Sequence, residues 1–170
     1  MSKIIQIGNE ILRKKAKEIK KEEFSLDNLD NLIKEMKETL NKEEDGFALA
    51  APQIGESVRI FIISGKLFQH LKGTDEPQSD KIYINPKILK TSKETELMEE
   101  GCLSIRNWYG KVKRYKKIKI EAFDQDGKKF QEGASGILSQ AFQHEIDHLD
   151  GILFTDIATE LEKIEPPQKK

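Results

Sequence analysis

The chain has 170 residues, 36% of them hydrophobic and 35% charged, which predicts a single globular domain with one core. Its 29 basic and 30 acidic residues leave a formal net charge of −1, so composition gives no sign of a nucleic-acid-binding or membrane-surface protein. No apolar run approaches the roughly 20 residues that cross a membrane. The single cysteine, Cys102, excludes an internal disulfide framework. Because the N-terminal segment also lacks the features of a signal peptide, we expect a cytoplasmic protein.

The first part of the chain predicts two helices, an irregular segment and a strand. Residues 10–19 form a short, lysine-rich helical candidate, and a stronger helix follows Ser25 as its N-cap. The apolar positions of this second helix recur at helical spacing: Leu29, Ile33, Met36 and Leu40. Residues 46–53 are apolar but have no regular period and contain a proline, so we expect a buried loop or an irregular edge segment. Residues 58–63 are rich in β-branched side chains and predict a buried strand.

The middle of the chain predicts further strands joined by polar connections. Residues 65–81 are polar and predict a mobile surface loop. Strand signals resume after this loop and end at Asn85-Pro86. Residues 117–123 alternate strictly between apolar and polar side chains, which predicts a strand with one face in solvent. A turn at Asp126-Gly127 then leads into a hairpin partner at residues 128–132.

A final helix is predicted from Gly136 to about residue 149, with Ser135 as its N-cap and Gly151 as its stop. Helices at both ends with antiparallel-type strands between them predict an α+β fold, in which antiparallel or mixed strands pack around the last helix. We expect one catalytic domain over residues 1–159 and a flexible C-terminal tail over residues 160–170.

The last predicted helix carries the pattern His144-Glu145-Ile146-Asp147-His148. Histidines four residues apart lie on the same helix face, so both imidazoles can reach one metal ion. The Glu145 carboxylate lies beside them, where it can act as a general base toward water. Shuffled chains of this composition contain the pattern in roughly one case in 250. The pattern therefore favours a metal site over a chance arrangement.

A helical wheel supports this interpretation. One half of the helix is apolar: Ile137, Leu138, Ala141, Phe142, Ile146 and Leu149. Glu145 and His148 fall within that half, and His144 lies at its edge. The other side takes the polar residues: Ser139, Gln140, Gln143 and Asp147. A buried carboxylate and buried imidazoles are unfavourable unless they are paired or bound to metal. The alternative is that both histidines are hydrogen-bonded core residues and that Glu145 forms a salt bridge.

A catalytic metal site on this helix needs a third protein ligand. A pattern that continues as His-x-x-Gly-x-x-His fails, because Phe154 occupies the last ligand position. A downstream glutamate is possible, and the C-terminal segment contains three: Glu160, Glu162 and Glu165. The remaining candidate is Cys102, because a thiolate binds Zn²⁺ and Fe²⁺ strongly and Gly101 allows its backbone to approach an ion closely. Taken alone, Cys102 would equally suit a buried apolar environment.

Three segments together resemble the signature motifs of the peptide deformylases. They are Glu100-Gly101-Cys102-Leu103-Ser104, the stretch from Gln143 to Gly151, and residues 46–53, which are similar to a Gly-x-Gly-x-Ala-Ala-x-Gln pattern. The motifs occur in the family's order, and the resemblance extends from about residue 4 to residue 157. It implies an enzyme that hydrolyses the N-formyl group of formylmethionine on nascent polypeptides and releases formate.

The resemblance also implies a role for individual residues. One divalent ion, natively Fe²⁺ and replaceable by Zn²⁺ or Ni²⁺, would be held by three side chains: Cys102, His144 and His148. Glu145 would take a proton from water and return it to the leaving amine. The side-chain N–H of Gln53 and the backbone N–H of Leu103 would stabilise the oxyanion that forms at the formyl carbonyl.

The expected substrate-binding residues lie in separate segments of the chain: Gly46, Phe47, Ala48, Gly101, Ile137 and Ala141. Gly46 would let an extended peptide add as a strand beside it. Phe47, Ile137 and Ala141 would form the apolar pocket for the methionine side chain. The chain departs from the family pattern at Ala48, which replaces a glycine, and at Arg106 and Tyr109, where the family often has proline and arginine. A Cβ at residue 48 is unfavourable by about 1 kcal/mol only if its φ is positive.

Residues 111–119 are strongly basic and are expected to form a solvated strand edge guarded by lysines. Their alternative role is a transient contact with ribosomal RNA, which suits an enzyme that acts on emerging chains. We expect no membrane and no specific nucleic-acid partner. Other interpretations remain open: a metallopeptidase or deacylase of different specificity, a metal-binding or ribosome-associated module without catalysis, and a metal-free globular protein.

Overall fold

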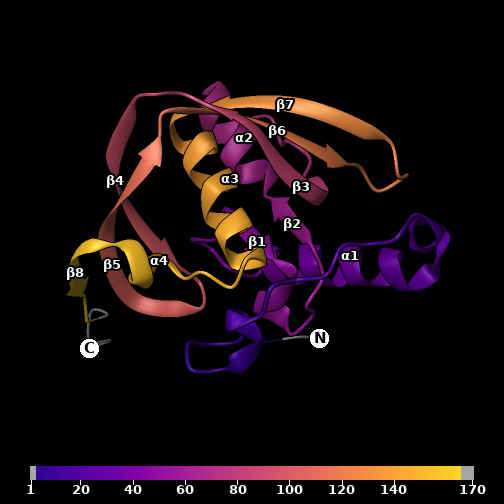
Figure 1. The fold of residues 1–170 in the computed structure, drawn as a ribbon, viewed down its shortest axis with the longest axis horizontal. Helices are drawn as coiled ribbons and strands as arrows, with labels where there is room; N and C mark the ends of the chain where they lie inside the picture. Colours follow the sequence, from indigo (N-terminus) through magenta and orange to yellow (C-terminus); the bar gives the residue numbers. More distant parts are fainter. Residues whose placement is uncertain (1–2, 166–170) are drawn as a thin grey trace.

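The computed structural model describes residues 3–165, which form an α+β fold as predicted (Figure 1). The helices are α1 (Asp27–Asn41), α2 (Gly65–Lys72), α3 (Gly136–Leu149) and α4 (Phe154–Ile157), and short 3-10 turns occur at η1 (Glu10–Arg13), η2 (Lys21–Ser25) and η3 (Ala51–Ile54). The strands are β1 (Ala48–Ala50), β2 (Ile60–Ile63), β3 (Lys81–Thr91), β4 (Thr95–Cys102), β5 (Ile105–Tyr115), β6 (Lys117–Phe123), β7 (Lys129–Ser135) and β8 (Thr159–Lys163). Within residues 3–165, no helix combines the length and the apolar character that crossing a membrane requires.

The strands form two antiparallel sheets, a larger one in the order β1-β2-β3-β6-β7 and a smaller one in the order β4-β5-β8. The prediction that a strand ends at Asn85-Pro86 is wrong. A bulge between Ile84 and Lys87 accommodates the proline, and β3 continues beyond it. Asn85 adopts a positive φ of 50° at this bulge, and its side chain exchanges hydrogen bonds of 2.8 and 2.9 Å with the backbone of Ile19. The bulge therefore ties the N-terminal segment to the sheet.

Helices cover both faces of the larger sheet because strand residues alternate between two apolar clusters. In β2, Phe61 and Ile63 face α3, whereas the residue before each of them faces α1. On the α3 side, Tyr83 stacks on Phe61 with ring centroids 4.7 Å apart and meets Phe142 edge-on at 4.9 Å. On the α1 side, the helix contributes the positions that its periodicity predicted: Leu29, Ile33, Met36 and Leu40. Burial of each of these apolar side chains contributes about 1.5–3 kcal/mol to stability, so the two clusters hold α3 and α1 firmly on the two faces of the sheet.

The other side of α3 is covered by the β4–β5 hairpin, so the helix lies between two sheets (Figure 1). Gln143 fastens the helix to β5: its Oε1 accepts the Tyr115 N–H and its Nε2 donates to the Tyr115 carbonyl, both at 3.0 Å. Ser139 donates to the same carbonyl at 2.9 Å. Both polar residues are buried. The polar side of the helical wheel is therefore a second packing face, on which side chains pair with strand backbone.

The predicted loop over residues 65–81 is wrong in its first half, where α2 forms. The Ser64 hydroxyl accepts the Lys66 N–H at 3.2 Å and caps the start of the helix. Gly73, at a φ of 60°, ends it in the left-handed conformation. An eight-residue helix of mixed composition has too few turns to show a clear period in the sequence.

The predicted helix over residues 10–19 is also wrong, since only η1 forms there. Beyond it the backbone pairs with other parts of the chain: Ala16 N–H donates to the Leu149 carbonyl at 2.8 Å, and Lys17 bridges to Val58. Tertiary pairing thus outweighs local helix propensity. The stronger predicted helix is present as α1. Its N-cap is Leu26 rather than the predicted Ser25, because Ser25 belongs to η2.

Predictions for the C-terminal half agree better with the structure. The β6–β7 hairpin forms, and α3 has the predicted bounds. Residues 160–163, at the start of the expected tail, belong to β8, which pairs with β5; residues 166–170 lie outside the described residues. The basic residues 111–119 form a sheet edge only in part: β6 lies between β3 and β7, whereas the pairing of β5 with β8 ends at Lys111, so residues 112–115 pair with β4 alone.

Candidate metal centre

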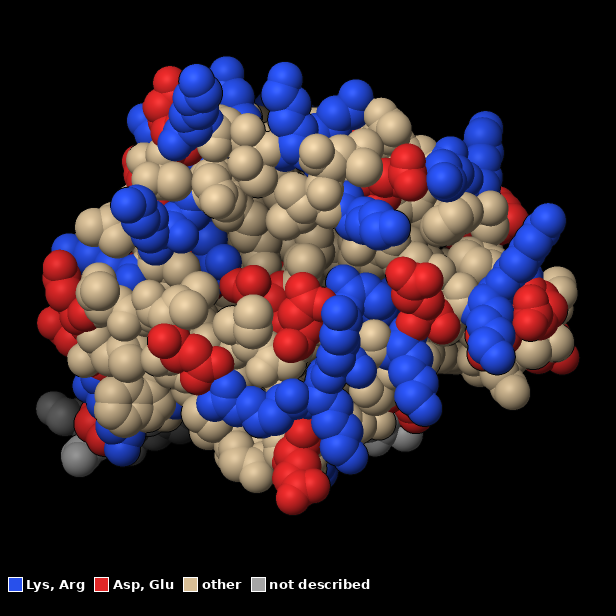
Figure 2. Space-filling view, in the orientation of Figure 1, with Lys and Arg blue, Asp and Glu red and all other residues tan. Residues whose placement is uncertain are grey.

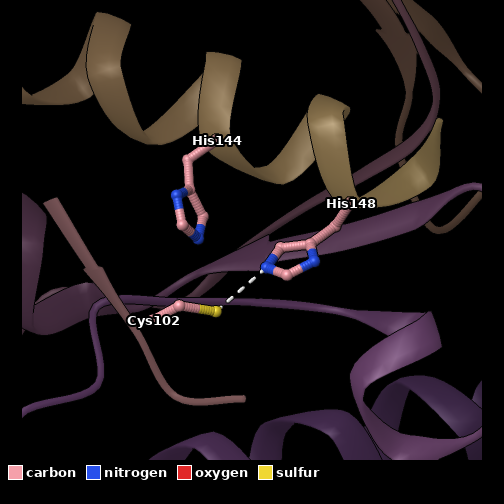
Figure 3. A group of neighbouring side chains, drawn as sticks. All are labelled: Cys102, His144 and His148. Atoms are coloured by element: carbon pink, nitrogen blue, oxygen red, sulfur yellow. Dashed lines mark hydrogen bonds between the residues drawn. The ribbon is translucent and has the colours of Figure 1, made fainter. Parts of the chain in front are cut away.

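Cys102, at the end of β4, and two histidines of α3 point toward one another (Figure 3). The Cys102 Sγ lies 3.2 Å from His148 Nε2, and the rings of His144 and His148 have centroids 4.9 Å apart. One ligand atom from each residue lies within 4.8 Å of the other two, a spacing that one metal ion can bridge. Glu160 and Glu162 of β8 and Glu165 beyond it take no part in this group, so the downstream-glutamate alternative for the third ligand is wrong.

Cys102 reaches the histidines because the β4–β5 hairpin is irregular at its tip. Cys102 pairs with Ile105, whereas the preceding Gly101 pairs with Tyr109, so residues 106–108 bulge outward. A Cβ at Gly101 would lie only 2.9 and 3.0 Å from ring carbons of Tyr109. Glycine is therefore required here for the close packing of Tyr109, a reason that the sequence did not reveal.

A buried carboxylate orients His144. Glu100 Oε1 lies 2.6 Å from His144 Nδ1, and both carboxylate oxygens accept hydrogen bonds from Arg114, at 2.6 and 3.0 Å. Burial opposes ionisation of Glu100, but its hydrogen bonds with His144 and Arg114 outweigh burial and lower the pKa of Glu100 to about 2. Arg114 also binds Asp147 at 2.6 Å. Because Nδ1 is engaged by an anion, Nε2 of His144 is left to face Cys102, the arrangement that commonly supports a metal-binding histidine.

The ligand set favours the thiolate form of Cys102. Burial raises the pKa of the thiol, but the nearby charge of His148 and hydrogen bonds with both histidines lower it to about 5. Ser104 N–H also donates to the sulfur at 3.4 Å. The thiolate is the form that binds metals, and a divalent cation would stabilise it further while taking the place of an imidazole proton. The donor set of one thiolate and two imidazoles therefore fits a transition-metal ion.

Within the His-Glu-x-x-His pattern, Glu145 suits proton transfer rather than metal binding. It is only 3% exposed, its Oε2 has no hydrogen-bond partner in the described structure, and no ion pair engages it within residues 3–165. The alternative of a salt-bridged Glu145 is therefore wrong. Burial raises the pKa of Glu145 to about 7, against the opposing effect of His144 and His148. A carboxyl group with that pKa can both accept and return a proton near neutral pH.

Gln53 lies beside the ligands in a fixed orientation. Its Oε1 accepts the Ala50 N–H at 2.8 Å, and its Nε2 donates to Ser104 Oγ at 3.1 Å and lies 3.6 Å from Cys102 Sγ. The amide N–H group is thereby held toward the metal-binding side. Leu103 follows Cys102 in the hairpin turn, and its carbonyl accepts a hydrogen bond of 3.0 Å from Gln6, which fixes the peptide plane after it.

A cleft of about 360 Å³ opens onto these groups. Its lining includes most residues that the sequence analysis singled out: Phe47, Ala48, Gln53, Gly101, Cys102, Leu103, Ile137, Ala141, His144 and Glu145. Gly46 and His148 are buried and do not line the cleft; a Cβ at Gly46 would lie only 2.9 Å from Glu43 Cβ. Ala48 is extended within β1 and pairs with Ile63, so its Cβ introduces no backbone strain.

Further lining residues were not predicted from the sequence: Asp45, Leu67, Glu99, Arg106, Asn107, Trp108, Tyr109 and Gln140. Leu67 was missed because its helix was interpreted as a loop. Arg106 and Tyr109 are expected from the sequence only as departures from a family pattern, and no sequence signal points to Asn107 or Trp108. Their bulge after the Cys102 motif is the feature that turns them toward the cleft.

Three side chains that could hold one metal ion, a buried carboxylate and an adjoining cleft are typical of a metallohydrolase. The family model for polypeptide deformylase matches residues 1–164. Peptide deformylase 2 of Clostridium acetobutylicum is 43% identical over 152 residues, which cover 89% of this chain and 91% of that protein. The chain therefore belongs to the polypeptide deformylase family, whose enzymes remove the N-formyl group from nascent chains.

Solved structures agree with this assignment. The crystal structure of peptide deformylase from Thermotoga maritima matches with a TM-score of 0.81 at 36% identity, covering 94% of this chain and 98% of that chain. The Met-Ala-Ser-bound structure of a class I type b peptide deformylase from Acinetobacter baumannii matches with a TM-score of 0.82 at 29% identity, covering 92% and 98% of the two chains. The predicted family and fold class are both confirmed.

Proposed function

We propose that this enzyme hydrolyses the formyl amide of formylmethionine at the N-terminus of peptides, with Glu145 as its general acid and base. The observation that carries the proposal is the buried Glu145 carboxylate, which has an unpartnered oxygen and lies beside the Cys102, His144 and His148 group in a cleft. Metal binding alone would require neither that carboxylate nor the adjoining cleft.

The cofactor is proposed to be one divalent ion, held by Cys102, His144 and His148. Two neutral imidazoles and one thiolate leave a divalent centre with a net charge of +1, and when bound such an ion supplies Lewis acidity toward water and the formyl carbonyl. The resemblance to the family favours Fe²⁺ as the native ion, with Zn²⁺ or Ni²⁺ able to replace it. The soft thiolate and the borderline imidazoles suit all three.

The protein's own groups account for proton transfer and charge stabilisation. Glu145 removes a proton from the attacking water, whose oxygen forms a bond to the formyl carbon. The Gln53 Nε2–H and the Leu103 N–H donate hydrogen bonds to the oxygen that gains negative charge. As the carbon–nitrogen bond breaks, Glu145 returns the proton to the amine, so that formate and a free N-terminus leave.

The substrate is proposed to bind as an added strand. β1 lies at one end of the larger sheet, and no strand of residues 3–165 pairs with its outer edge, where an extended peptide can add near Gly46 and Ala48. Phe47 and Ile137 are 45% and 43% exposed and lie with Ala141 on the cleft, where they can enclose a methionine side chain. Gly101 completes the lining beside Cys102. The Met-Ala-Ser bound to the Acinetobacter baumannii relative is a peptide of the expected class.

The working location is proposed to be the cytoplasm, with transient ribosome association. Lys117 and Lys119 lie on the exposed face of β6, with Lys90 across the strand pair from Lys119. Figure 2 shows basic side chains gathered along the top of the molecule, where β6 and β7 lie in Figure 1. Arg114 does not contribute, because it is buried in its ion pairs with Glu100 and Asp147. Ribosome pelleting with wild type and a Lys117→Glu, Lys119→Glu variant tests the association, and equal binding of the two would remove this surface from consideration.

Formate release from a formyl-Met peptide tests the central proposal. The protein is purified without oxygen and loaded separately with Fe²⁺, Ni²⁺ or Zn²⁺, and the matching acetyl-Met peptide is the control. We expect metal-dependent release of formate and an inert control. Hydrolysis of the acetyl peptide but not of the formyl peptide would instead favour a deacylase of different specificity.

A further inference from the structure

The N-terminal segment fastens together the two parts of the chain that carry the proposed oxyanion donors. Residues 5–7 connect η3, which contains Gln53, with the turn of the β4–β5 hairpin, which contains Leu103. Three hydrogen bonds make this connection: Ile5 N–H to the Gln53 carbonyl at 2.8 Å, Gln6 Nε2 to the Leu103 carbonyl at 3.0 Å, and Ile7 N–H to the Ser104 carbonyl at 2.8 Å. We call residues 5–7 the N-terminal strap.

The turn of the β4–β5 hairpin depends on contacts from outside the strand ladder. Cys102 pairs with Ile105, so Leu103 and Ser104 are the two central residues of the turn. Two-residue turns that match the twist of their strands have a positive φ at one or both central residues, but neither Leu103 nor Ser104 has one. The peptide group between these two residues lies outside the ladder, so ladder hydrogen bonds do not fix its orientation.

Two contacts hold this peptide group, one on each side. Its carbonyl, from Leu103, accepts the Gln6 amide, and its N–H, from Ser104, donates to Cys102 Sγ at 3.4 Å. The carbonyl and the N–H of a trans peptide group point in opposite directions, so turning this group over would break both hydrogen bonds. The Leu103 side chain is buried in the apolar cluster on the α1 side of the sheet. With that side chain packed and the following peptide group held, the Leu103 backbone has little freedom to reorient its own N–H.

Gln6 acts through its side-chain amide rather than through packing. Its neighbours Ile4 and Ile5 pack on two different apolar clusters and anchor the strap. Gln6 itself is exposed and does not line the cleft. Its amide also lies 3.3 Å from the Ile4 carbonyl, which keeps it on this side of the strap. Replacing Gln6 by an uncharged side chain without a donor therefore removes the hydrogen bond to Leu103 and little packing.

We propose that Gln6 is a positioning residue for the reaction: by holding the peptide group between Leu103 and Ser104, it keeps the Leu103 N–H aimed at the oxygen that gains negative charge. An oxyanion site is effective when its donors are aimed at one oxygen before the charge develops. The strap favours this arrangement because it also binds the backbone of Gln53, whose side chain carries the other proposed donor. The inference rests on the proposed deformylase function and adds to it a residue outside the cleft.

Loss of the Gln6 hydrogen bond should lower kcat rather than raise KM. Removing an oxyanion donor outright lowers kcat by roughly 100- to 1,000-fold. Loss of the Gln6 amide loosens the Leu103 donor without removing it, so we expect kcat to fall about three- to ten-fold, the usual contribution of one hydrogen bond. KM should stay within about two-fold, because the formyl oxygen of the bound substrate gains its charge only during the attack.

The experiment compares kcat and KM of Gln6→Met and wild type for amidated formyl-Met-Ala-Ala, with the Ni²⁺-loaded full chain. Methionine has nearly the length of glutamine but no hydrogen-bond donor. Gln131→Met is the matched control and should leave kcat unchanged, since Gln131 is exposed on β7 and does not line the cleft. A kcat of Gln6→Met within about 1.5-fold of wild type, or a loss confined to KM, would overturn the proposal.

Amide hydrogen exchange tests the hold on the peptide group without any turnover. It is followed by NMR on the substrate-free, Zn²⁺-loaded chain, and exchange of the Ser104 N–H should be several-fold faster in Gln6→Met and unchanged in Gln131→Met. Equal exchange in Gln6→Met and wild type, together with normal wild-type turnover, overturns the role of Gln6 and leaves the deformylase proposal standing. Lack of formate from wild type overturns the deformylase proposal, whereas faster Ser104 exchange in Gln6→Met would still support the hold of the strap on the turn.

Discussion

Replacing Glu100 by glutamine tests how far a residue outside the ligand set controls the metal centre. The Glu100 carboxylate contacts His144 at 2.6 Å and shares two hydrogen bonds with Arg114. Its pKa falls from an ordinary 4.5 to about 2, which corresponds to about 3 kcal/mol of net stabilisation by these partners. Only part of that energy reaches His144, so we expect metal affinity to fall 10- to 100-fold, or about 1.4–2.7 kcal/mol.

The assay is competition for Ni²⁺ or Zn²⁺ between the protein and a chelator of known affinity. Glu100→Gln should keep its fold, because glutamine has the same shape and Arg114 retains Asp147 at 2.6 Å. Glu96→Gln is the matched control, since Glu96 is an exposed carboxylate on the same strand. Metal affinity in Glu100→Gln within two-fold of the control would refute the argument that the carboxylate orients and polarises His144.

The remaining predictions concern Glu145, the acid limit of stability and the anchoring of α3. Glu145→Gln should still bind metal but lose at least ~100-fold in kcat, the usual minimum for removing a general acid–base group, as measured by formate release. The folded state lowers the pKa of Glu100, so the ionised Glu100 carboxylate stabilises the fold above pH ~4.5 and this stabilisation is lost as the pH falls toward about 2. Glu100→Gln should therefore make the free energy of unfolding less dependent on pH between these two values. Gln143→Leu should lower the free energy of unfolding by ~1–3 kcal/mol in urea titrations, since the Tyr115 N–H loses its acceptor and the Tyr115 carbonyl keeps only the Ser139 hydroxyl as a donor.

The helix that carries the site could be predicted closely because its signals are local. Apolar spacing, a stop at Gly151 and the His-Glu-x-x-His pattern all lie within one segment, and α3 forms over Gly136–Leu149 as expected. The burial of its polar side could not be predicted, because a helical wheel shows which residues share a face but not what covers that face. Ser139 and Gln143 are buried under β5, which is contiguous with them only in space.

The third ligand shows the limit of reasoning from spacing. Nothing in the local sequence places Cys102 near His148. Spacing alone leaves the Cys102 thiol as one of several candidates for the third ligand, and only the resemblance to a family pattern favours it. The position of Cys102 depends on the register of the β4–β5 hairpin and on its bulge after Gly101. Register of this kind is set by long-range pairing and packing, so a single sequence reveals it poorly.

The locations of the departures from the family pattern separate two parts of the site. The metal-binding part is held on one side by the apolar cluster around Phe142 and on the other by the hydrogen bonds of Gln143 to β5, so a small change there alters the ligand geometry. Arg106 instead lies in the bulge of the β4–β5 hairpin and pairs with Glu43 and Asp45, which lie in the connection between α1 and β1. Exchange of a charge at this periphery changes the electric field along the exit of the cleft while the ligands stay in place.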